Sequence, residues 1–208
     1  IEKRFAEHWS WRPVSRPEVP ATKVETWATS EIDRFILAKL EDANLKPAAP
    51  ADDRIWLRRV YFDLIGLPPT PEQIREASTK SRGEVVDEIL ASPRFGEKWA
   101  RHWMDLVRYA ETCGHEFDYP IPNAHEYRDY LIRAFNLNLP YDEFIREHIA
   151  GDLLPDPRRN EAEEFNESVI ATGHWYFHDA THAPTDVLQN ESDHQDSQID
   201  VMGKTFQA

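Results

Sequence analysis

Repeated helix-start signals constrain the fold of this chain more than any other feature of its sequence. Four segments carry such signals: Ser30 with Asp33, Thr70 with Pro71, Ser81 with Glu84, and Ser92 with Pro93. Two of these pairs have the spacing of a capping box, and the other two place proline at the first helical position. No period-two strand pattern and no Asn-Gly hairpin signal accompany them. The sequence therefore predicts an all-α fold.

Apolar residues at helical spacing predict eight or nine helices around one irregular core. The expected ranges begin at 30, 51, 71, 81, 93, 123, 141, 164 and 192; the fifth runs to about 112 and the last to 208. Residues 1–29 are predicted to form an extended arm, because prolines and tryptophans dominate this stretch. Residues 30–208 are predicted to form the helical domain, with a possible subdivision near 152–163 and a truncated C-terminal end.

Composition excludes several classes of protein. The net charge of −14 disfavours binding to nucleic acid, which requires clustered Lys and Arg, and to anionic membrane surfaces. A single cysteine excludes an internal disulfide framework. No apolar run is long enough to span a membrane, and the first residues have no signal-peptide core. Both ends resemble cuts within a longer protein.

Titratable residues gather around the end of the helix expected over 93–112. The candidate catalytic residues are Asp105, Arg108, Glu111, His115 and Asp118. Arg101, Asp105 and Arg108 also have the spacing of a helical ion-pair ladder, which needs no function. The alternative is a cleft in which the carboxylates bind a cation or act as acid and base. The loop could also form a metal site from oxygen and nitrogen ligands, with contributions from His115, Glu116, Asp118, His125 and Asp129.

A histidine tract is the second candidate site. His174, His178 and His182 would share one face of a continuous helix, and paired imidazoles bind zinc and other transition metals. The residue after the first histidine is Trp175, so the general-base glutamate of a metalloprotease is missing. A glycine before and a proline after the tract argue against one continuous helix.

An acidic segment opens the helix expected over 192–208. Its members are Glu191, Asp193, His194, Asp196 and Asp200. Acidic groups at a helix N-terminus complement the helix dipole. The alternative is a Ca²⁺ site, although the ordered spacing of an EF-hand loop is absent.

Several motifs resemble the second cytochrome-associated domain of large planctomycete cytochrome-c-like proteins, a domain of unknown function. The matching segments are DRFILAKLE (33–41), RRVYFDLIGLPPTPEQI (58–74), LASPRFGEKWARHWMDLVRYAE (90–111), NAHEYRDYLIRAFN (123–136) and PYDEFIREHIAGDLLP (140–155). The resemblance implies an exported, periplasmic or extracellular parent protein with a c-type haem module before this domain and another domain after it. It supplies no catalytic residues.

Three functional hypotheses follow. The first is a module that scaffolds a haem centre or an electron-transfer or substrate partner, with neighbouring haem-bearing and C-terminal domains as partners. In that setting, one histidine of the 174–182 tract could be a distal haem ligand. The second is a metal-assisted hydrolase or lyase acting on carbohydrate. The third is a non-catalytic interaction module. We expect no haem attachment within this chain, because it lacks a Cys-x-x-Cys-His motif.

Overall fold

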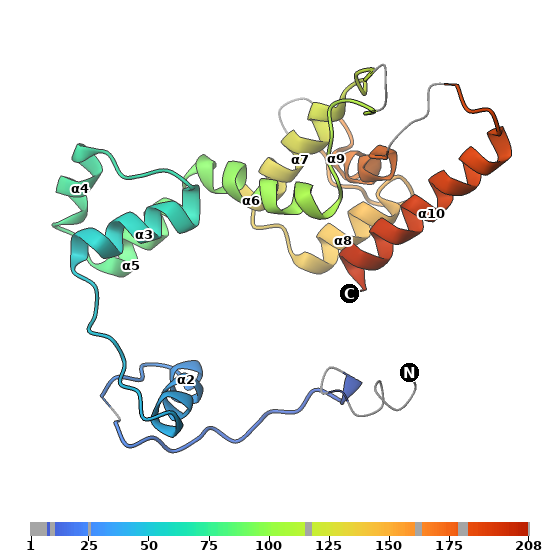
Figure 1. The fold of residues 1–208 in the computed structure, drawn as a ribbon. Coiled ribbons are helices and arrows are strands. Elements are labelled where there is room, and N and C mark those ends of the chain that lie inside the picture. The colour runs from blue at the N-terminus through green and yellow to red at the C-terminus, as the bar shows by residue number, and fades with distance from the viewer. Residues whose placement is uncertain are drawn as a thin grey trace. The chain divides into compact units, whose positions relative to one another are not determined.

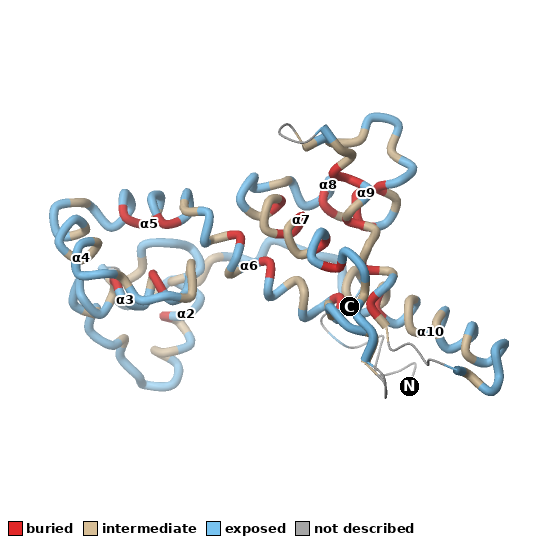
Figure 2. The backbone as a smooth tube through the Cα atoms, turned by 90° about the horizontal axis from the view of Figure 1, so that it is seen from above, coloured by how far each residue is buried: buried red, intermediate tan, exposed pale blue. Residues whose placement is uncertain are grey.

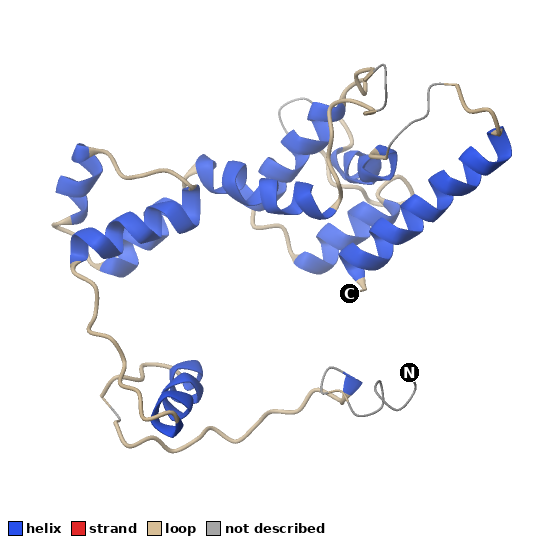
Figure 3. Ribbon diagram, in the orientation of Figure 1, coloured by secondary structure: helices blue, strands red, loops and turns tan. Residues whose placement is uncertain are grey.

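The computed structural model of the chain describes residues 8, 11–24, 26–114, 118–160, 164–178 and 183–207. Within these ranges all regular secondary structure is helical, which confirms the all-α class (Figure 3). The described β-pairing is limited to two isolated bridges. The chain divides into two compact units, Ile1–Ala51 and Asp52–Ala208. The sequence-based boundary after residue 29 and the subdivision near 152–163 stay predictions.

The predicted capping signals start the helices where the sequence places them. Ser30, Thr70 and Ser81 each cap a helix, and in each case the third helical residue bonds back to complete a capping box. Ser92 accepts a hydrogen bond from the backbone of Arg94, and Pro93 occupies the first turn. Local side-chain chemistry therefore decides these helix starts.

The first unit combines the N-terminal arm with helix α2 (Glu31–Asp42). Over residues 13–22 the arm is extended, as predicted (Figure 1). The backbone amides of Lys23 and Val24 donate to the Glu41 carboxylate at 2.9–3.2 Å. Leu37 is fully buried in this unit. A carboxylate on α2 thus holds the arm along the helix.

The second unit begins with three helices, α3 (Asp53–Ile65), α4 (Pro71–Ala77) and α5 (Arg82–Leu90). Their core consists of Leu57 and Tyr61 from α3 and Val85 and Ile89 from α5, against which Ile74 and Ala77 of α4 pack. Gly66 ends α3 in the left-handed conformation at φ 73°, which lets the chain turn sharply toward α4. α3 also packs against α6, which connects this cluster to the main core.

The main core forms around α6 (Pro93–Leu106) and α7 (Ala124–Asn136), joined by α8 (Tyr141–Ala150), α9 (Glu167–Ile170) and the 3₁₀ helix η2 (Ala171–Tyr176). Tyr127, Tyr130, Leu131 and Ala134 share one face of α7 and are buried. Figure 2 shows the buried positions concentrated where α7, α8 and α9 meet. The segment expected as one helix over 164–176 is instead a single α-turn followed by 3₁₀ geometry.

Two buried carboxylates pair with arginines beneath this core. The carboxylate of Glu147 accepts hydrogen bonds from Arg158 at 2.9 and 3.1 Å, from Tyr130 at 2.7 Å and from Ser168 at 2.8 Å. Glu167 is likewise buried and paired with Arg133. Glu147 thus joins α8 to α9 through Ser168, and Glu167 joins α9 to α7 through Arg133.

The last helix, α10, spans Val187–Phe206 and begins five residues before its predicted start. Asp186 caps it by accepting from the backbone of Gln189 at 3.0 Å. The predicted start at residue 192 is therefore wrong, because the aspartate cap starts the helix at Val187. None of the helices that the structure describes has the length and apolar character needed to cross a membrane.

Candidate functional site

The end of α6 creates the candidate site. α6 was expected to reach about residue 112, but it ends at Leu106. Arg108 has a left-handed φ of 57°, and the amide of Tyr109 bonds to the carbonyl of Met104 at 2.9 Å. This is the Schellman type of helix end, with arginine where glycine or asparagine is usual. The unfavourable backbone conformation costs roughly 1–2 kcal/mol, so other contacts must hold Arg108 in place.

Contacts with α10 hold Arg108 in this left-handed conformation. Nη2 of Arg108 donates to the backbone oxygen and to Oγ of Ser197, both at 2.9 Å. The predicted ion-pair ladder is therefore wrong: Arg108 has left the helix, and among the described residues no ion pair joins Asp105 to Arg101 or Arg108.

The loop after α6 returns on itself before α7 begins. Thr112 and Pro120 form an isolated bridge, and Oδ1 of Asp118 accepts from the amide of Gly114 at 3.1 Å. Cys113 lies half-buried in this loop. His115 and Glu116 lie outside the described residues, so their predicted roles stay predictions.

Glu111 ties this loop to α7. Its Oε1 accepts from Tyr109 Oη at 3.0 Å and from Arg128 Nη1 at 3.1 Å, and Arg128 also pairs with Asp129 at 2.9 Å. Burial, followed by the hydrogen bond with Glu111, raises the pKa of Tyr109 to about 12. The predicted catalytic carboxylates Glu111 and Asp118 thus make contacts that order the loop, and Asp105 is exposed on α6.

A polar cavity of about 370 Å³ lies where this loop meets η2 and α10. We call it the α10 cavity; its lining residues are Arg108, Ala110, Thr112, Phe177, His178, Asn190, Asp193, His194 and Ser197. Of the predicted site residues, Arg108 and His178 line it. Segments up to 89 positions apart in sequence therefore contribute to one cavity.

Two histidines face each other in the α10 cavity. The ring centroids of His178 and His194 lie 4.0 Å apart, at an interplanar angle of 38°. Nε2 of His194 is shielded from solvent and has no hydrogen-bond partner among the described residues. Sequence reasoning placed His194 in an acidic segment at a helix start. That interpretation is wrong, since the first turn of α10 contains no acidic residue.

His174 lies apart from this pair, in the aromatic core. Its ring is 5.4 Å from that of His148 and 6.0 Å from that of Phe206, measured between centroids. The prediction that His174 and His178 share one face of a continuous helix is wrong, because η2 ends at Tyr176, between them. His182 lies outside the described residues. Within the described part of the chain, no three His, Cys, Asp or Glu side chains are grouped so that they could hold a metal ion.

His148 is a fully buried histidine that sequence reasoning missed. Its Nε2 accepts from Tyr127 at 2.9 Å and from Trp103 at 3.1 Å, while Nδ1 is 2.8 Å from the carbonyl oxygen of Phe144. Burial lowers the pKa of His148 to about 3, and burial likewise lowers the pKa of His174. The one available signal was its position four residues after Phe144, on the apolar face of α8.

Acid should weaken folding through these two histidines. Between pH 6.5 and about 3, His148 takes up a proton in the unfolded chain but not in the folded one, so stability falls as pH falls. Such a histidine contributes up to about 1.4 kcal/mol per pH unit. In urea unfolding at pH 6.5 and 5, His148→Gln should lose less stability on acidification than wild type. The exposed control His125→Gln should keep the wild-type slope; equal slopes in all three proteins would contradict the assignment.

The residues of this chain do not fit a covalently bound haem. A c-type attachment uses two cysteines, and the chain has only Cys113. His174 has a shielded Nε2 without a partner among the described residues, but its ring is 2% exposed and enclosed by other rings. A haem iron therefore has no path to this nitrogen in the folded core, and no redox step is assigned to this chain.

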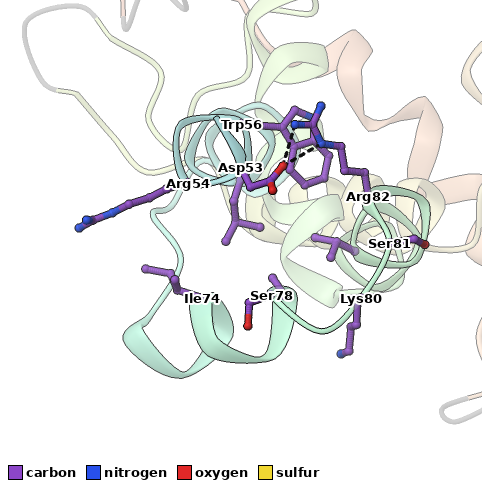
Figure 4. A pocket seen from close by; sticks show the side chains of 11 residues that line it. Asp53, Arg54, Trp56, Ile74, Ser78, Lys80, Ser81 and Arg82 are labelled. Atoms are coloured by element: carbon purple, nitrogen blue, oxygen red, sulfur yellow. Dashed lines mark hydrogen bonds and ion pairs between the residues drawn. The ribbon is translucent and has the colours of Figure 1, made fainter. Parts of the chain in front are cut away.

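A second cavity, of about 510 Å³, lies among α3, α4 and α5 (Figure 4). The guanidinium of Arg82 lies 4.9 Å from the ring centroid of Trp56 and bonds to Asp53 at 2.7 Å. Leu57, Ile74 and Val85 also line the cavity. None of the predicted site residues contributes to it. Its apolar walls suit an apolar group, while the guanidinium of Arg82 lies over the Trp56 ring.

The fold and the cavities define an all-α helical module with a polar cavity beside its last helix. The chain belongs to the PSCyt2 family, described as a protein of unknown function (DUF1549), which matches residues 31–208. This match agrees with the sequence resemblance at the level of an uncharacterised domain. Comparisons with curated proteins and with solved structures found no match.

Proposed function

We propose that this chain is a scaffolding module of an exported, c-type-cytochrome-linked protein, and that α10 docks a haem-bearing neighbouring domain. The family label suggests a cytochrome association. The resemblance implies export, a planctomycete setting and a haem module next to this domain. Because the chain cannot attach haem covalently, its contribution to electron transfer would be to position the domain that does.

The incomplete packing of α10 carries this proposal. Its second half is anchored to the rest of the domain. Gln198 donates a hydrogen bond to the carbonyl of Trp175 at 3.0 Å, and Val201 is buried. The ring centroids of Phe206 and Trp103 lie 5.9 Å apart. Its first half extends away from the other helices (Figure 1). Three large apolar side chains of α10 are exposed, namely Val187, Leu188 and Ile199. Exposed apolar groups on an extended helix are typical of a partner-binding surface.

Charge indicates the kind of partner. α10 contains four acidic residues, Glu191, Asp193, Asp196 and Asp200, and one basic residue, Lys204. The chain as a whole has a net charge of −14. Such a surface is complementary to a positively charged domain, and complementary charge accelerates association at low salt. We therefore expect a basic haem domain as the partner.

The test is a binding titration between this chain and the neighbouring haem domain of the parent protein, produced separately. Leu188→Ser should weaken binding at least tenfold, because Leu188 is 78% exposed and available to a partner. Affinity should also fall as salt rises from 50 to 300 mM, since screening weakens charge attraction.

The matched control is Leu153→Ser in the turn after α8, where the leucine is 77% exposed. It should bind like wild type. Equal weakening by both substitutions, or binding that does not depend on salt, would count against docking through α10.

The alternative of a metal-assisted hydrolase or lyase acting on carbohydrate has less support. Asp105, Glu111 and Asp118 do not line the α10 cavity. Glu111 and Asp118 are instead engaged in loop contacts. A catalytic role for these carboxylates stays a prediction.

A further inference from the structure

One imidazole of the α10 cavity, that of His194, lacks a hydrogen-bond partner among the described residues, and the proposed docking role does not supply one. His194 Nε2 is shielded from solvent, and no described residue bonds to it. A shielded polar atom without a partner costs about 1–3 kcal/mol. The ring of His178 lies 4.0 Å away, so two nitrogen-bearing rings meet at one wall of the cavity. Such an arrangement indicates a ligand from outside the chain.

The lining brings together two imidazoles and one carboxylate, which are groups that bind metal cations. Asp193 contributes a carboxylate to the cavity lining, and its Oδ1 accepts from Gln189 at 2.8 Å. Arg108 is the positive group of the lining, and its Nη2 is already bonded to Ser197. Neutral imidazole is a ligand for zinc, nickel and copper.

We propose that His178 and His194 bind one transition-metal ion at the wall of the α10 cavity. Metal–nitrogen bonds of about 2.0–2.1 Å at a tetrahedral centre place two ring centroids about 5 Å apart. The rings would therefore separate by about 1 Å, which small side-chain rotations allow. No group of three protein ligands exists among the described residues. The remaining coordination positions would thus face the cavity and take water or a small oxygen ligand.

This site is independent of the docking role, and each can fail without the other. The first test is isothermal titration of the untagged chain with Ni²⁺ and, separately, with Ca²⁺. Ni²⁺ should bind with a stoichiometry of one, and His178→Ala or His194→Ala should each weaken that binding at least tenfold. Ca²⁺ prefers carboxylate oxygens, so its weak binding should be the same in all variants.

His125→Ala is the matched control. His125 is a half-exposed histidine on α7, 3.5 Å from Glu126 and absent from the cavity lining. Its removal should leave Ni²⁺ affinity unchanged. Equal Ni²⁺ affinity in wild type and His194→Ala would overturn the site. Equal losses in all three variants would do the same, since they indicate general surface binding.

A measurement on the wild-type chain removes any dependence on how the variants fold. Substoichiometric Ni²⁺ should broaden the imidazole proton resonances of His178 and His194 before those of His102 and His125. Broadening of all four histidines together, or of the surface pair first, would overturn the proposal. Broadening confined to His178 and His194 would support it.

Discussion

Replacing Glu147 by Ala should lower the free energy of unfolding by about 3–5 kcal/mol, the largest effect we expect from any single change. Glu147 is 3% exposed and receives two hydrogen bonds from Arg158, whose side chain is only 24% exposed. Removing the carboxylate leaves this guanidinium without its counter-charge. Tyr130 and Ser168 lose their acceptor at the same time. Urea unfolding of wild type and variant measures the difference.

Glu143→Ala is the control, because Glu143 is exposed in the first turn of the same helix. It should change stability by less than about 0.5 kcal/mol. Glu147→Gln, which keeps the size but not the charge, should fall between the two. If Glu147→Ala lowered the free energy of unfolding by no more than Glu143→Ala does, the buried pair would not stabilise the junction of α8 and α9.

Gly96→Ala should destabilise the chain by about 2–3 kcal/mol, through overpacking. A Cβ at this position would overlap the backbone oxygen of Ile132 and lie 2.7 Å from the Asn136 amide group. Asn136 cannot easily move, because it accepts from the Gly96 amide at 2.8 Å and donates to Pro93 at 3.0 Å. The helices α6 and α7 approach so closely here that only glycine fits. Thermal and urea unfolding both report the loss.

Gly83→Ala provides the comparison at an uncrowded glycine. Nothing lies within 4 Å of a Cβ built on Gly83, near the start of α5. Alanine also has the higher helix propensity, so this change should be neutral or stabilise by up to about 1 kcal/mol. If both alanine variants had the same stability, close packing of α6 on α7 would not be the reason for glycine at position 96.

Helix starts were predictable from sequence because their signals are local. Ser30, Thr70 and Ser81 act through neighbours three residues away, so no knowledge of the tertiary fold is needed. The end of α6 was not predictable in this way. Arg108 takes the left-handed position that glycine normally marks, and its anchor, Ser197, lies far along the chain. The start of α10 has a local signal in its cap Asp186, which lies six residues before the predicted start at 192.

The candidate site was predictable only in part, for the same reason. Candidate residues were found in both contributing segments, and Arg108 and His178 do line one cavity. The pairing of His178 with His194 joins residues 16 positions apart, and no short-range sequence pattern encodes it. The buried carboxylate of Glu147 was missed, although a charged residue three positions after Phe144 on an apolar face was a visible signal.

Hydrogen exchange in the full-length parent protein tests the central claim most directly, by comparing α10 there with α10 in the isolated chain. Docking of a neighbouring domain should slow amide exchange across residues 187–196, the half of α10 that extends from the other helices. Residues 197–206, anchored in both proteins, should change little. Unchanged exchange over residues 187–196 in the full-length protein would contradict the proposal that α10 docks a neighbouring domain.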